Sequence, residues 1–415
     1  MEWVAIAGVD WGGQKHAYSI ENRAGERKRG EFGSSAEQVH EWARSLKQWY
    51  RSGRVVVAVE AGCNGLMYAL AQYEHIVLAP INPRASKSYR DSLRLSGASD
   101  DPSDAELICE FALRHVEKLR LWQPEDEAST ELRMLAEHRR VLVDQRTAAT
   151  HTMAAALKGC FPQVLEWFEA ETSKPLRAFV ERWPTLERAR GASRDQIEQM
   201  LRDCRVRKSP IRATTLSDRI ATATPLVNDS AVVSAWARSA QAQVAFIEVL
   251  EAQIALYDQA IDRAWQQHRD REIFDSLPGA GRVLAPRLAA AFGIDRDRFS
   301  SAAEMQCYSG IAPVTEKSGK QCWIHARWAF PTFLHQTFHE FAQASISLSP
   351  WAKAVYHQQR QRGAGRHEAI RALAFRWIRI LFRLWQTGEK YDEQTHLDRL
   401  RLKGSPLALQ FASKT

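Results

Sequence analysis

The sequence lacks the features that mark membrane-embedded, secreted and zinc-binding proteins. No apolar run approaches the roughly 18 residues that a membrane span needs, and the N-terminus does not show the pattern of a signal peptide. Only six of the 415 residues are cysteine and none stands in CxxC spacing, which predicts reduced thiols and neither a disulfide framework nor a zinc site. We therefore expect a soluble cytoplasmic protein.

The composition is otherwise that of an ordinary globular protein with an excess of positive charge. Hydrophobic residues make up 45% and charged residues 26% of the chain, which is long enough for two or three domains. The 57 lysines and arginines outnumber the 49 acidic residues, so that the formal net charge is +8 at pH 7. This balance favours a polyanionic partner without identifying it.

Hydrophobic patterning predicts a mixed sheet in the first third of the chain. Continuous or alternating apolar residues predict strands over 4–9, 16–20, 28–32, 55–59 and 76–81. Helical spacing predicts a helix over 36–49, and a second helix is expected from Leu66. The resulting order, βββαβαβ with acidic residues at strand ends, is that of a ribonuclease-H-like fold.

Four acidic residues stand where such a sheet could bring them together. Asp10 and Glu60 each end a predicted strand, whereas Asp101 and Asp104 lie three residues apart at the start of a predicted helix. Asp100 with Asp104 is the competing pair, and Asp101 is alternatively the N-cap of this helix.

A set of four carboxylates suits divalent cations. Mg²⁺ prefers carboxylate and water ligands, and two ions about 4 Å apart can clamp the attacking and leaving oxygens of a phosphodiester. Without metal, so many acids held together would repel one another strongly. We therefore predict a site for Mg²⁺, with two ions, that serves phosphoryl transfer or hydrolysis on nucleic acid.

The motifs around these acids resemble those of the DEDD transposases of bacterial insertion sequences. The matching segments are GVDW at 8–11, VAVEAG at 57–62, INP at 81–83 and SDDPSDA at 99–105. The family's fourth motif, K-T-D-x-x-D-A, matches Asp101 and Asp104 rather than Asp100, but its Lys-Thr pair is missing here. The resemblance implies a RuvC-like nuclease domain in which Asp10, Glu60, Asp101 and Asp104 bind the metal and take part in catalysis.

The middle of the chain is predicted to be helical. Helices are expected over 105–118, 129–158 and 230–269. Apolar residues near heptad spacing in the last of these predict a coiled-coil seam, which serves either an oligomer contact or packing within one chain. Residues 165–228 lack a clean period. Their basic block at 202–212, which includes Arg207 and Lys208, is either a solvated loop or a loop that contacts phosphates.

The segment LPGAGR at 277–282 predicts a turn that opens a helix. Gly279 and Gly281 would expose backbone N–H groups at the helix start, and Arg282 follows them, an arrangement that suits a phosphate. The LPGxG pattern resembles the helix-hairpin-helix motif, which binds the nucleic-acid backbone without sequence preference. The alternative is a plain turn between two helices.

A second family signature follows near residue 310. The residues 310–313, GIAP, and 318–320, SGK, resemble the family's Gly-Leu-x-Pro turn followed by Ser-Gly-Gly or Ser-Gly-Lys. In that family the serine attacks DNA and becomes covalently joined to it, so the resemblance assigns this role to Ser318. Lys317 and Lys320 would neutralise the scissile phosphate, and Arg327 would replace a lysine of the family.

Together these observations predict an α/β plus α protein: a ribonuclease-H/RuvC-like mixed sheet domain, a long helical coiled-coil linker and a mainly helical C-terminal domain. The expected bounds are 1–115 for the nuclease domain, 116–270 for the linker with its basic insertion, 271–395 for the serine-bearing domain and 396–415 for a tail.

The resemblance implies a transposase or recombinase that cuts and rejoins the DNA of an insertion element in the bacterial nucleoid. Its partners would be double-stranded DNA at the element ends and target, a structured bridge RNA that selects them, and further copies of the chain in a dimer or tetramer. One alternative is a metal-dependent nuclease or Holliday-junction resolvase that uses water as the nucleophile. Another is a protein that binds DNA and no longer cuts it.

Overall fold

Residues 1–126 carry the longer strands of the chain, whereas residues 127–415 are mainly helical, and each of these two parts is a compact unit. The computed structural model describes residues 3–51, 53–60, 64–93, 100–319, 321–327 and 329–404. None of the helices in these ranges is both long and apolar enough to cross a membrane.

The first unit is built on a five-stranded mixed sheet in the order β3-β2-β1-β4-β5. The strands are β1 (Trp3–Trp11), β2 (Lys15–Asn22), β3 (Arg27–Gly33), β4 (Arg54–Glu60) and β5 (Ile76–Ile81). β1 pairs antiparallel with β2 and parallel with β4, and β4 pairs parallel with β5. The five predicted strands are therefore present, and their arrangement is consistent with a ribonuclease-H-like domain.

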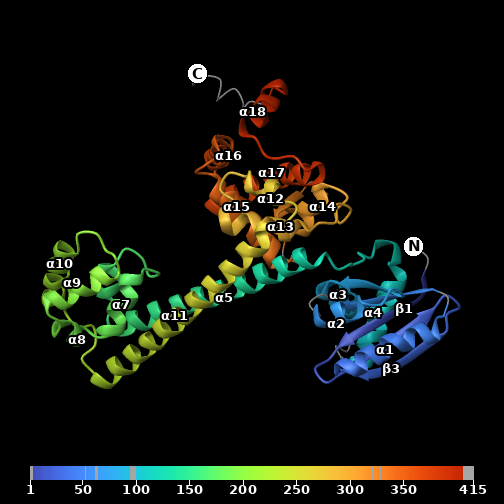
Figure 1. The fold of residues 1–415 in the computed structure, drawn as a ribbon, viewed down its shortest axis with the longest axis horizontal. Coiled ribbons are helices and arrows are strands. Elements are labelled where there is room, and N and C mark those ends of the chain that lie inside the picture. The colour runs from blue at the N-terminus through green and yellow to red at the C-terminus, as the bar shows by residue number, and fades with distance from the viewer. Residues whose placement is uncertain are drawn as a thin grey trace. The chain divides into compact units, whose positions relative to one another are not determined.

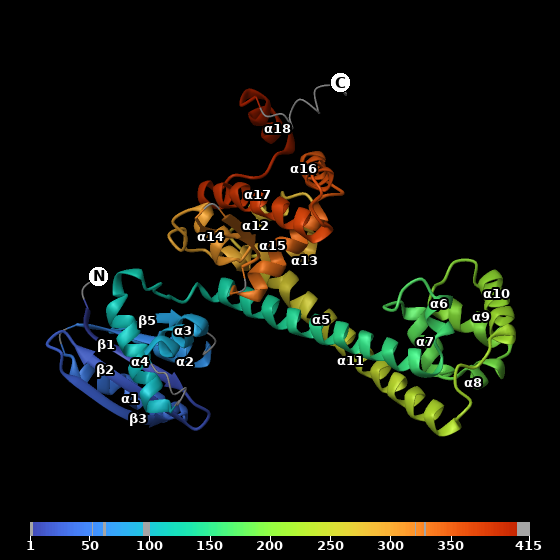
Figure 2. The same cartoon turned by 180° about the vertical axis from the view of Figure 1, so that it is seen from behind.

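Helices cover both faces of this sheet. α1 (Ala36–Trp49) and α2 (Asn64–Leu70) pack on one face, where apolar side chains of alternate strand positions form the larger core. α4 (Asp101–Arg114) packs on the other face through Ile108 and Ala112 (Figures 1 and 2). α3 (Pro83–Leu93), which precedes α4, and the short helix η1 (Val116–Lys118) complete the unit.

In the second unit, two long helices lie side by side, α5 (Glu127–Cys160) and α11 (Ser230–Gln266) (Figures 1 and 2). The buried residues of α11 follow the predicted seam: Val244, Ile247, Leu250, Ile254 and Ile261. Because α5 of the same chain covers α11, this seam serves packing within one chain, the second of the two alternatives that heptad spacing left open.

Residues 165–228 showed no clean period, and residues 163–222 fold into five short helices that share a core with α5 and α11. These are α6 (Gln163–Trp167), α7 (Lys174–Arg182), α8 (Leu186–Arg190), α9 (Arg194–Asp203) and α10 (Ser209–Thr222). The basic block is therefore not a long loop. It ends α9, makes a turn over 204–208, and begins α10. Each helix is too short to show a clear hydrophobic period, and several begin at a side-chain cap such as Ser173, Thr185 or Ser193.

The C-terminal part is mainly helical, as predicted, with one β-hairpin. Its helices are α12 (Arg271–Asp275), α13 (Gly281–Phe292), α14 (Ala302–Tyr308), α15 (Thr332–Ser345), α16 (Pro350–Gln361), α17 (Arg366–Thr387) and α18 (Glu393–Leu402). The hairpin consists of β6 (Val314–Ser318) and β7 (Gln321–His325). The core of this part centres on Trp377 and Trp385 of α17, both fully buried.

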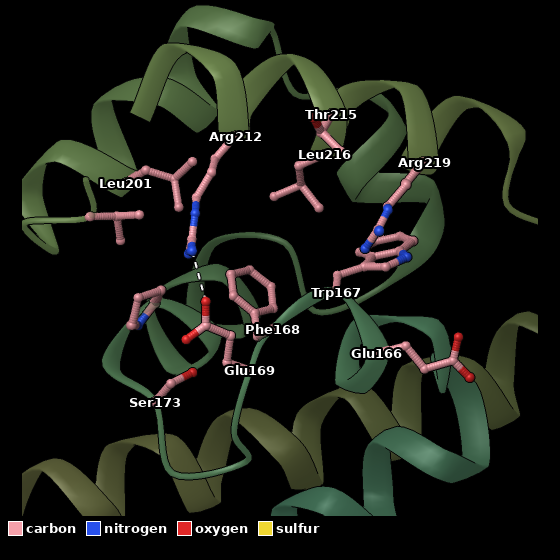
Figure 3. Close-up of a pocket in the computed structure, with 12 residues that line it drawn as sticks. Glu166, Trp167, Phe168, Glu169, Ser173, Leu201, Arg212, Thr215, Leu216 and Arg219 are labelled. Atoms are coloured by element: carbon pink, nitrogen blue, oxygen red, sulfur yellow. Dashed lines mark hydrogen bonds and ion pairs between the residues drawn. The ribbon is translucent and has the colours of Figure 1, made fainter. Parts of the chain in front are cut away.

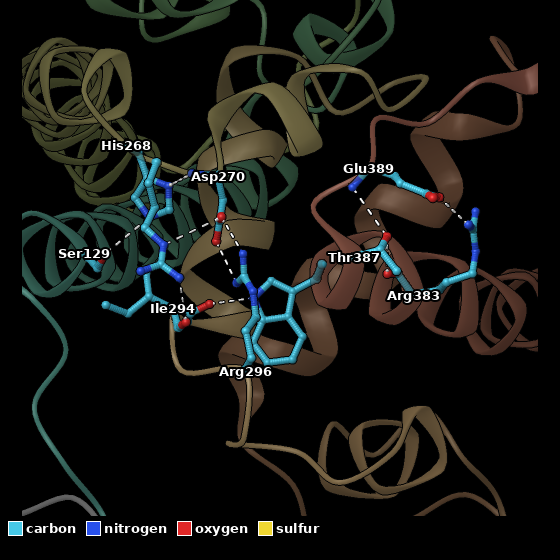
Figure 4. A network of polar contacts seen from close by, with 11 residues as sticks. Ser129, His268, Asp270, Ile294, Arg296, Arg383, Thr387 and Glu389 are labelled. Atoms are coloured by element: carbon cyan, nitrogen blue, oxygen red, sulfur yellow. Dashed lines mark hydrogen bonds and ion pairs between the residues drawn. The ribbon is translucent and has the colours of Figure 1, made fainter.

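A partly buried ion pair joins the segment between α11 and α12 to this core. Both carboxylate oxygens of Asp270 accept hydrogen bonds from the guanidinium of Arg296, at 2.6 and 2.9 Å (Figure 4). The same guanidinium lies over the ring of Trp385 at 4.8 Å. Such a bidentate, partly buried pair is the kind that contributes to stability, because geometry and burial both strengthen it.

Glu340 of α15 forms a second charged link, between α5 and α13. It accepts hydrogen bonds from Arg140 of α5, at 2.7 Å, and from Arg287 of α13. The side chain of Arg287 is only 4% exposed, and its burial lowers the pKa of the guanidinium. Breaking this link would therefore leave a buried charge without its carboxylate.

Replacing Glu340 by glutamine should destabilise the protein by about 2–3 kcal/mol, because Arg287 would stay buried without a compensating charge. The change is measured as a shift in the urea midpoint of unfolding. The matched control is Glu272→Gln, which removes an exposed carboxylate paired with Lys390 and should leave the midpoint unchanged. Equal shifts for the two variants would show that burial of Arg287 does not govern this link.

Candidate active site

Asp10 and Glu60 lie at the carboxyl ends of two neighbouring parallel strands. Side chains alternate between the faces of a strand, and Val9 faces the core under α1, so Asp10 faces the side that α4 covers. The same alternation places Glu60 on that side, because Val59 faces the core under α1. Since Val9 pairs with Val59, the two carboxylates stand at the same level of the sheet.

The first turn of α4 supplies the other two carboxylates. Asp100 is the N-cap: its backbone is extended, and its side chain accepts a hydrogen bond from the N–H of Ser103 at 2.9 Å. Asp101 and Asp104 then fall in the first helical turn, with Asp104 only 7% exposed. Because Asp100 serves as the cap, Asp101 is available to the site. This favours Asp101 with Asp104, the pair that matches the family motif.

Gly8 allows α4 to lie close to β1. A Cβ atom at Gly8 would stand 2.3 Å from the carbonyl oxygen of Ala105 and 2.3 Å from the backbone nitrogen of Cys109. A Cβ atom at Gly12 would lie 3.7 Å from the Oδ2 of Asp101. The close approach at Gly8 therefore brings the first turn of α4 to the end of β1 that carries Asp10.

The four carboxylates influence one another electrostatically. Burial, and then the charges of Asp104, Asp101 and Glu60, raise the pKa of Asp10 from 3.8 to about 6. Arg90 of α3 acts in the opposite direction, and its Nη2 lies 3.0 Å from the Oδ2 of Asp104. Residues from β1, β4, α3 and α4 thus form one charged cluster.

The chemistry of this cluster suits a hard divalent cation, since it offers carboxylate oxygens and an unfavourable excess of negative charge. Asp10, Glu60, Asp101 and Asp104 would hold such an ion. Within the described ranges, however, no three acidic, histidine or cysteine side chains already converge in the arrangement of a metal site. One of the four carboxylates, that of Asp104, is instead paired with Arg90, a cation of the protein itself.

Arg90 was not predicted, because the sequence reasoning took Asn82-Pro83 as the end of a strand. The structure shows that this dipeptide also starts α3: the N–H of Arg84 donates to the Oδ1 of Asn82 at 2.9 Å, and Pro83 occupies the first turn. An Asn-Pro step that begins a helix was therefore the signal that could have found the helix carrying Arg90.

Ser318 is the last residue of β6, at the tip of an exposed hairpin. It pairs with Gln321 of β7, and Gly319 adopts a φ of 58° in the turn. Alternation along β6 places Lys317 on the opposite face from Ser318. Glu316, whose carboxylate lies 3.4 Å from the Nε2 of His325, shares the face of the serine. Lys320, predicted to bind phosphate, lies outside the described residues.

The turn between α12 and α13 has the predicted glycines, but it packs within the protein. Gly279 adopts a φ of 86°, and a Cβ atom there would meet the backbone of Ala344 in α15 at 2.8 Å. Gly281 adopts a φ of 52° and faces open space. Arg282 is exposed and ion-paired with Asp262. Close packing explains Gly279 without a ligand, so phosphate binding at this turn stays a prediction.

The other predicted basic residues occupy surface positions in different places. Arg207 and Lys208 are exposed in the turn between α9 and α10, where Lys208 has a φ of 55°. Arg327 follows β7 and is partly buried. Arg207 and Lys208 thus share the α9–α10 turn, whereas Arg327 follows the β6–β7 hairpin in a different part of the sequence.

A shallow cavity of about 370 Å³ lies among α6, α7, α9 and α10 (Figure 3). Trp167 and Phe168 line it together with Arg219, and Arg212 donates a hydrogen bond to Glu169 across it at 2.7 Å. Its acidic and basic side chains offset one another, so its charge does not indicate a ligand.

Comparison with known proteins connects this cluster to a family. The sequence model of the IS110-type DEDD transposases matches residues 7–162, which contain all four carboxylates. The model described as the transposase IS116/IS110/IS902 family matches residues 271–357, which contain Ser318. The chain belongs to the IS110 family of DEDD transposases. It is accordingly a DNA transposase, an enzyme that cuts and joins DNA.

Relatives of this transposase match it over most of its length. The mini-circle protein of IS117 from Streptomyces coelicolor is 27% identical over 352 residues, which cover 82% of this chain and 83% of that protein. The 42 kDa protein of insertion element IS900 from Mycobacterium paratuberculosis is 26% identical over 357 residues, which cover 85% and 84% of the two chains. The predicted family and enzyme class are therefore confirmed.

Proposed function

We propose that this transposase cuts and rejoins the DNA of its element with a metal-binding carboxylate cluster and a serine nucleophile. The first part is supported by the convergence of four carboxylates: β1 and β4 end side by side at Asp10 and Glu60, and α4, which begins with Asp101 and Asp104, packs closely on β1 at Gly8. Acidic residues that meet at one end of a sheet repel one another, and a bound cation would offset that repulsion.

The metal that we propose is Mg²⁺, with two ions. They would be held by Asp10, Glu60, Asp101 and Asp104. When bound, Mg²⁺ supplies charge stabilisation for the phosphodiester oxygens. The protein contributes the positions of the four carboxylates, which the paired ends of β1 and β4 and the first turn of α4 determine. It also contributes partial burial, which strengthens electrostatic interactions at the site.

Ser318 would be the nucleophile. As its Oγ–P bond forms, the bond between phosphorus and the leaving sugar oxygen breaks, the serine hydroxyl loses its proton, and the leaving oxygen gains one. Attack by a sugar hydroxyl of the second DNA strand reverses these changes and releases the serine, so rejoining needs no further energy source. The support for this role is the match of the Ser-Gly-Lys signature and the exposed position of Ser318 at a hairpin tip.

Replacing Ser318 by alanine should abolish the covalent protein–DNA adduct and reduce strand transfer by at least about a thousandfold, since no other hydroxyl takes its place. Both are measured with labelled element-end DNA on a denaturing gel. The matched control is Thr315→Val, which changes an exposed residue on the opposite face of the same hairpin and should keep both activities. A Ser318→Ala protein that still cuts normally would favour a nuclease or junction resolvase that uses water.

The partners that we propose are double-stranded DNA at the element ends and target, a structured bridge RNA that selects them, and further copies of the chain. The family resemblance and the net charge of +8 support the nucleic-acid partners. The test is to purify the protein with its bound nucleic acid and sequence that nucleic acid. Recovery of a transcript from the element would support guidance, and recovery of random cellular RNA would contradict it.

A further inference from the structure

Arg90 is a cation placed within the carboxylate cluster. It lies on α3, and its Nη2 is 3.0 Å from the Oδ2 of Asp104. The side chains are only 23% and 9% exposed, respectively, so water screens this pair less than a surface pair. The Nε of Arg90 is also buried, and it has no hydrogen-bond partner among the described residues.

Arg140 and Arg287, which pair with Glu340, also have a buried Nε without a partner among the described residues. Arg90 differs from them because its partner, Asp104, belongs to the carboxylate cluster, where a phosphate oxygen can serve as a second acceptor. A buried guanidinium normally directs all of its donors to acceptors, because an unsatisfied buried donor costs free energy. Here one side of the planar donor fork binds Asp104, and Nε remains available. An arginine fork matches the geometry of a phosphate oxygen pair as well as that of a carboxylate.

The charges of the cluster also suit a cation that can move aside. Four carboxylates and one guanidinium leave a net charge of −3, which two divalent ions would turn into a small positive excess that favours a phosphate. A metal ion that uses Asp104 must compete with Arg90 for the same Oδ2. The guanidinium would then be freed within reach of the site, where a phosphate oxygen can accept its hydrogen bonds.

We propose that Arg90 is a resident cation of the active site: it holds Asp104 while the metal is absent, gives up that carboxylate to the metal, and then binds a phosphate oxygen of the DNA. This inference rests on the proposed metal-binding function of the four carboxylates. It adds a substrate-binding residue that the acidic motifs do not include, and it assigns that residue an effect on metal affinity.

The first test measures Mn²⁺ binding to the full-length protein by calorimetry without DNA. Arg90→Gln should bind Mn²⁺ about tenfold more tightly than the wild type, because a competing positive charge is removed from the cluster. Arg90→Lys, which keeps the charge, should stay within about twofold of the wild type. The matched control is Arg29→Gln. Arg29 pairs at 2.9 Å with Glu106, which lies on α4 as Asp104 does but outside the cluster. This variant should bind Mn²⁺ as the wild type does.

The second test measures DNA binding with Ca²⁺ in place of Mg²⁺, so that the protein binds DNA without cutting it. Arg90→Gln should weaken binding to all DNA sequences alike and reduce the slope of log K against log salt by about one phosphate contact. Arg29→Gln should leave the slope unchanged. If glutamine impairs folding, Arg90→Met, which retains the apolar stem, gives the same two measurements.

The outcomes distinguish this inference from the proposed function beneath it. Unchanged or weaker Mn²⁺ binding by folded Arg90→Gln, or an unchanged salt slope, would overturn the role of Arg90. Failure of the wild type to bind Mn²⁺, with Asp104→Asn indistinguishable from it, would instead overturn the metal site itself. Tighter Mn²⁺ binding together with the smaller slope supports both parts of the inference.

Discussion

Replacing Asp10 by asparagine is expected to abolish DNA cleavage while making the metal-free protein more stable. Cleavage should fall by at least about a thousandfold, because the amide cannot supply the charge that the metal requires. Stability at pH 7.5 in EDTA should rise by about 1–2 kcal/mol, a value reduced for the partial exposure of the carboxyl group. The causes are the burial of Asp10 and, after it, the repulsion that Asp104, Asp101 and Glu60 impose on the ionised carboxylate.

The pH dependence of this gain follows from the direction of the shift. The pKa of Asp10 in the folded protein is about 6, above its ordinary 3.8, so the folded state holds the proton more tightly than the unfolded state. Stability of the wild type therefore falls as pH rises from about 4 to about 6, and the loss is complete above that window. Asparagine does not ionise, so the variant should gain stability above pH 6 and gain none near pH 4.

Chemical unfolding of both proteins between pH 4 and pH 8 tests this expectation. Added Mg²⁺ should stabilise the wild type and not the variant, since only a protein that binds the ion in its folded state gains from it. An Asp10→Asn protein that is less stable than the wild type at pH 7.5 would show that the carboxylates are not crowded together. Equal stabilisation of both proteins by Mg²⁺ would place the ion elsewhere.

Replacing Gly8 by valine is expected to remove activity by moving a helix rather than a catalytic group. The Cβ atom would stand 2.3 Å from backbone atoms of Ala105 and Cys109, which no side-chain rotation can relieve. α4 would have to move away from β1 and carry Asp101 and Asp104 with it. We expect a loss of at least about 3 kcal/mol in stability and a loss of cleavage of at least about a hundredfold, because a shift of about 1 Å in a catalytic group has that effect.

The matched control is Gly65→Ala in α2, where a Cβ atom meets nothing within 4 Å. Alanine there should leave cleavage unchanged and stabilise the protein slightly, since glycine is unfavourable within a helix. Thermal unfolding and cleavage rates of the two variants are compared at the same pH. Full activity in Gly8→Val would show that α4 does not position the acids against β1.

Sequence reasoning succeeded where one local pattern decides the outcome. The strands of the sheet and the helix over 36–49 follow from apolar periodicity, and their observed bounds differ from the predicted ones by few residues. The helix start at Asp101 follows from a capping residue and a proline. These signals lie within a few residues of the structure that they specify.

Sequence reasoning was incomplete where two segments compete for one role. The apolar seam of α11 is compatible both with a contact between copies of the chain and with packing against a helix of the same chain. The structure decides for the second, because α5 covers the seam. Asp100 and Asp101 were both candidates for the cap and for the site, and only the hydrogen bond from Ser103 assigns the cap to Asp100. The five short helices of 163–222 were not separated, because each spans too few turns for a period to show.

The sequence by itself determined that Asp10 and Glu60 end strands, that two more acids begin a helix, and that the motifs are those of a DEDD transposase. Only the tertiary structure decided that these acids share one face of the sheet and that Gly8 admits α4 beside β1. It also placed Arg90 against Asp104. The physical reason is that strand alternation and helix capping are local, whereas the distance between a helix and a strand depends on every side chain packed between them.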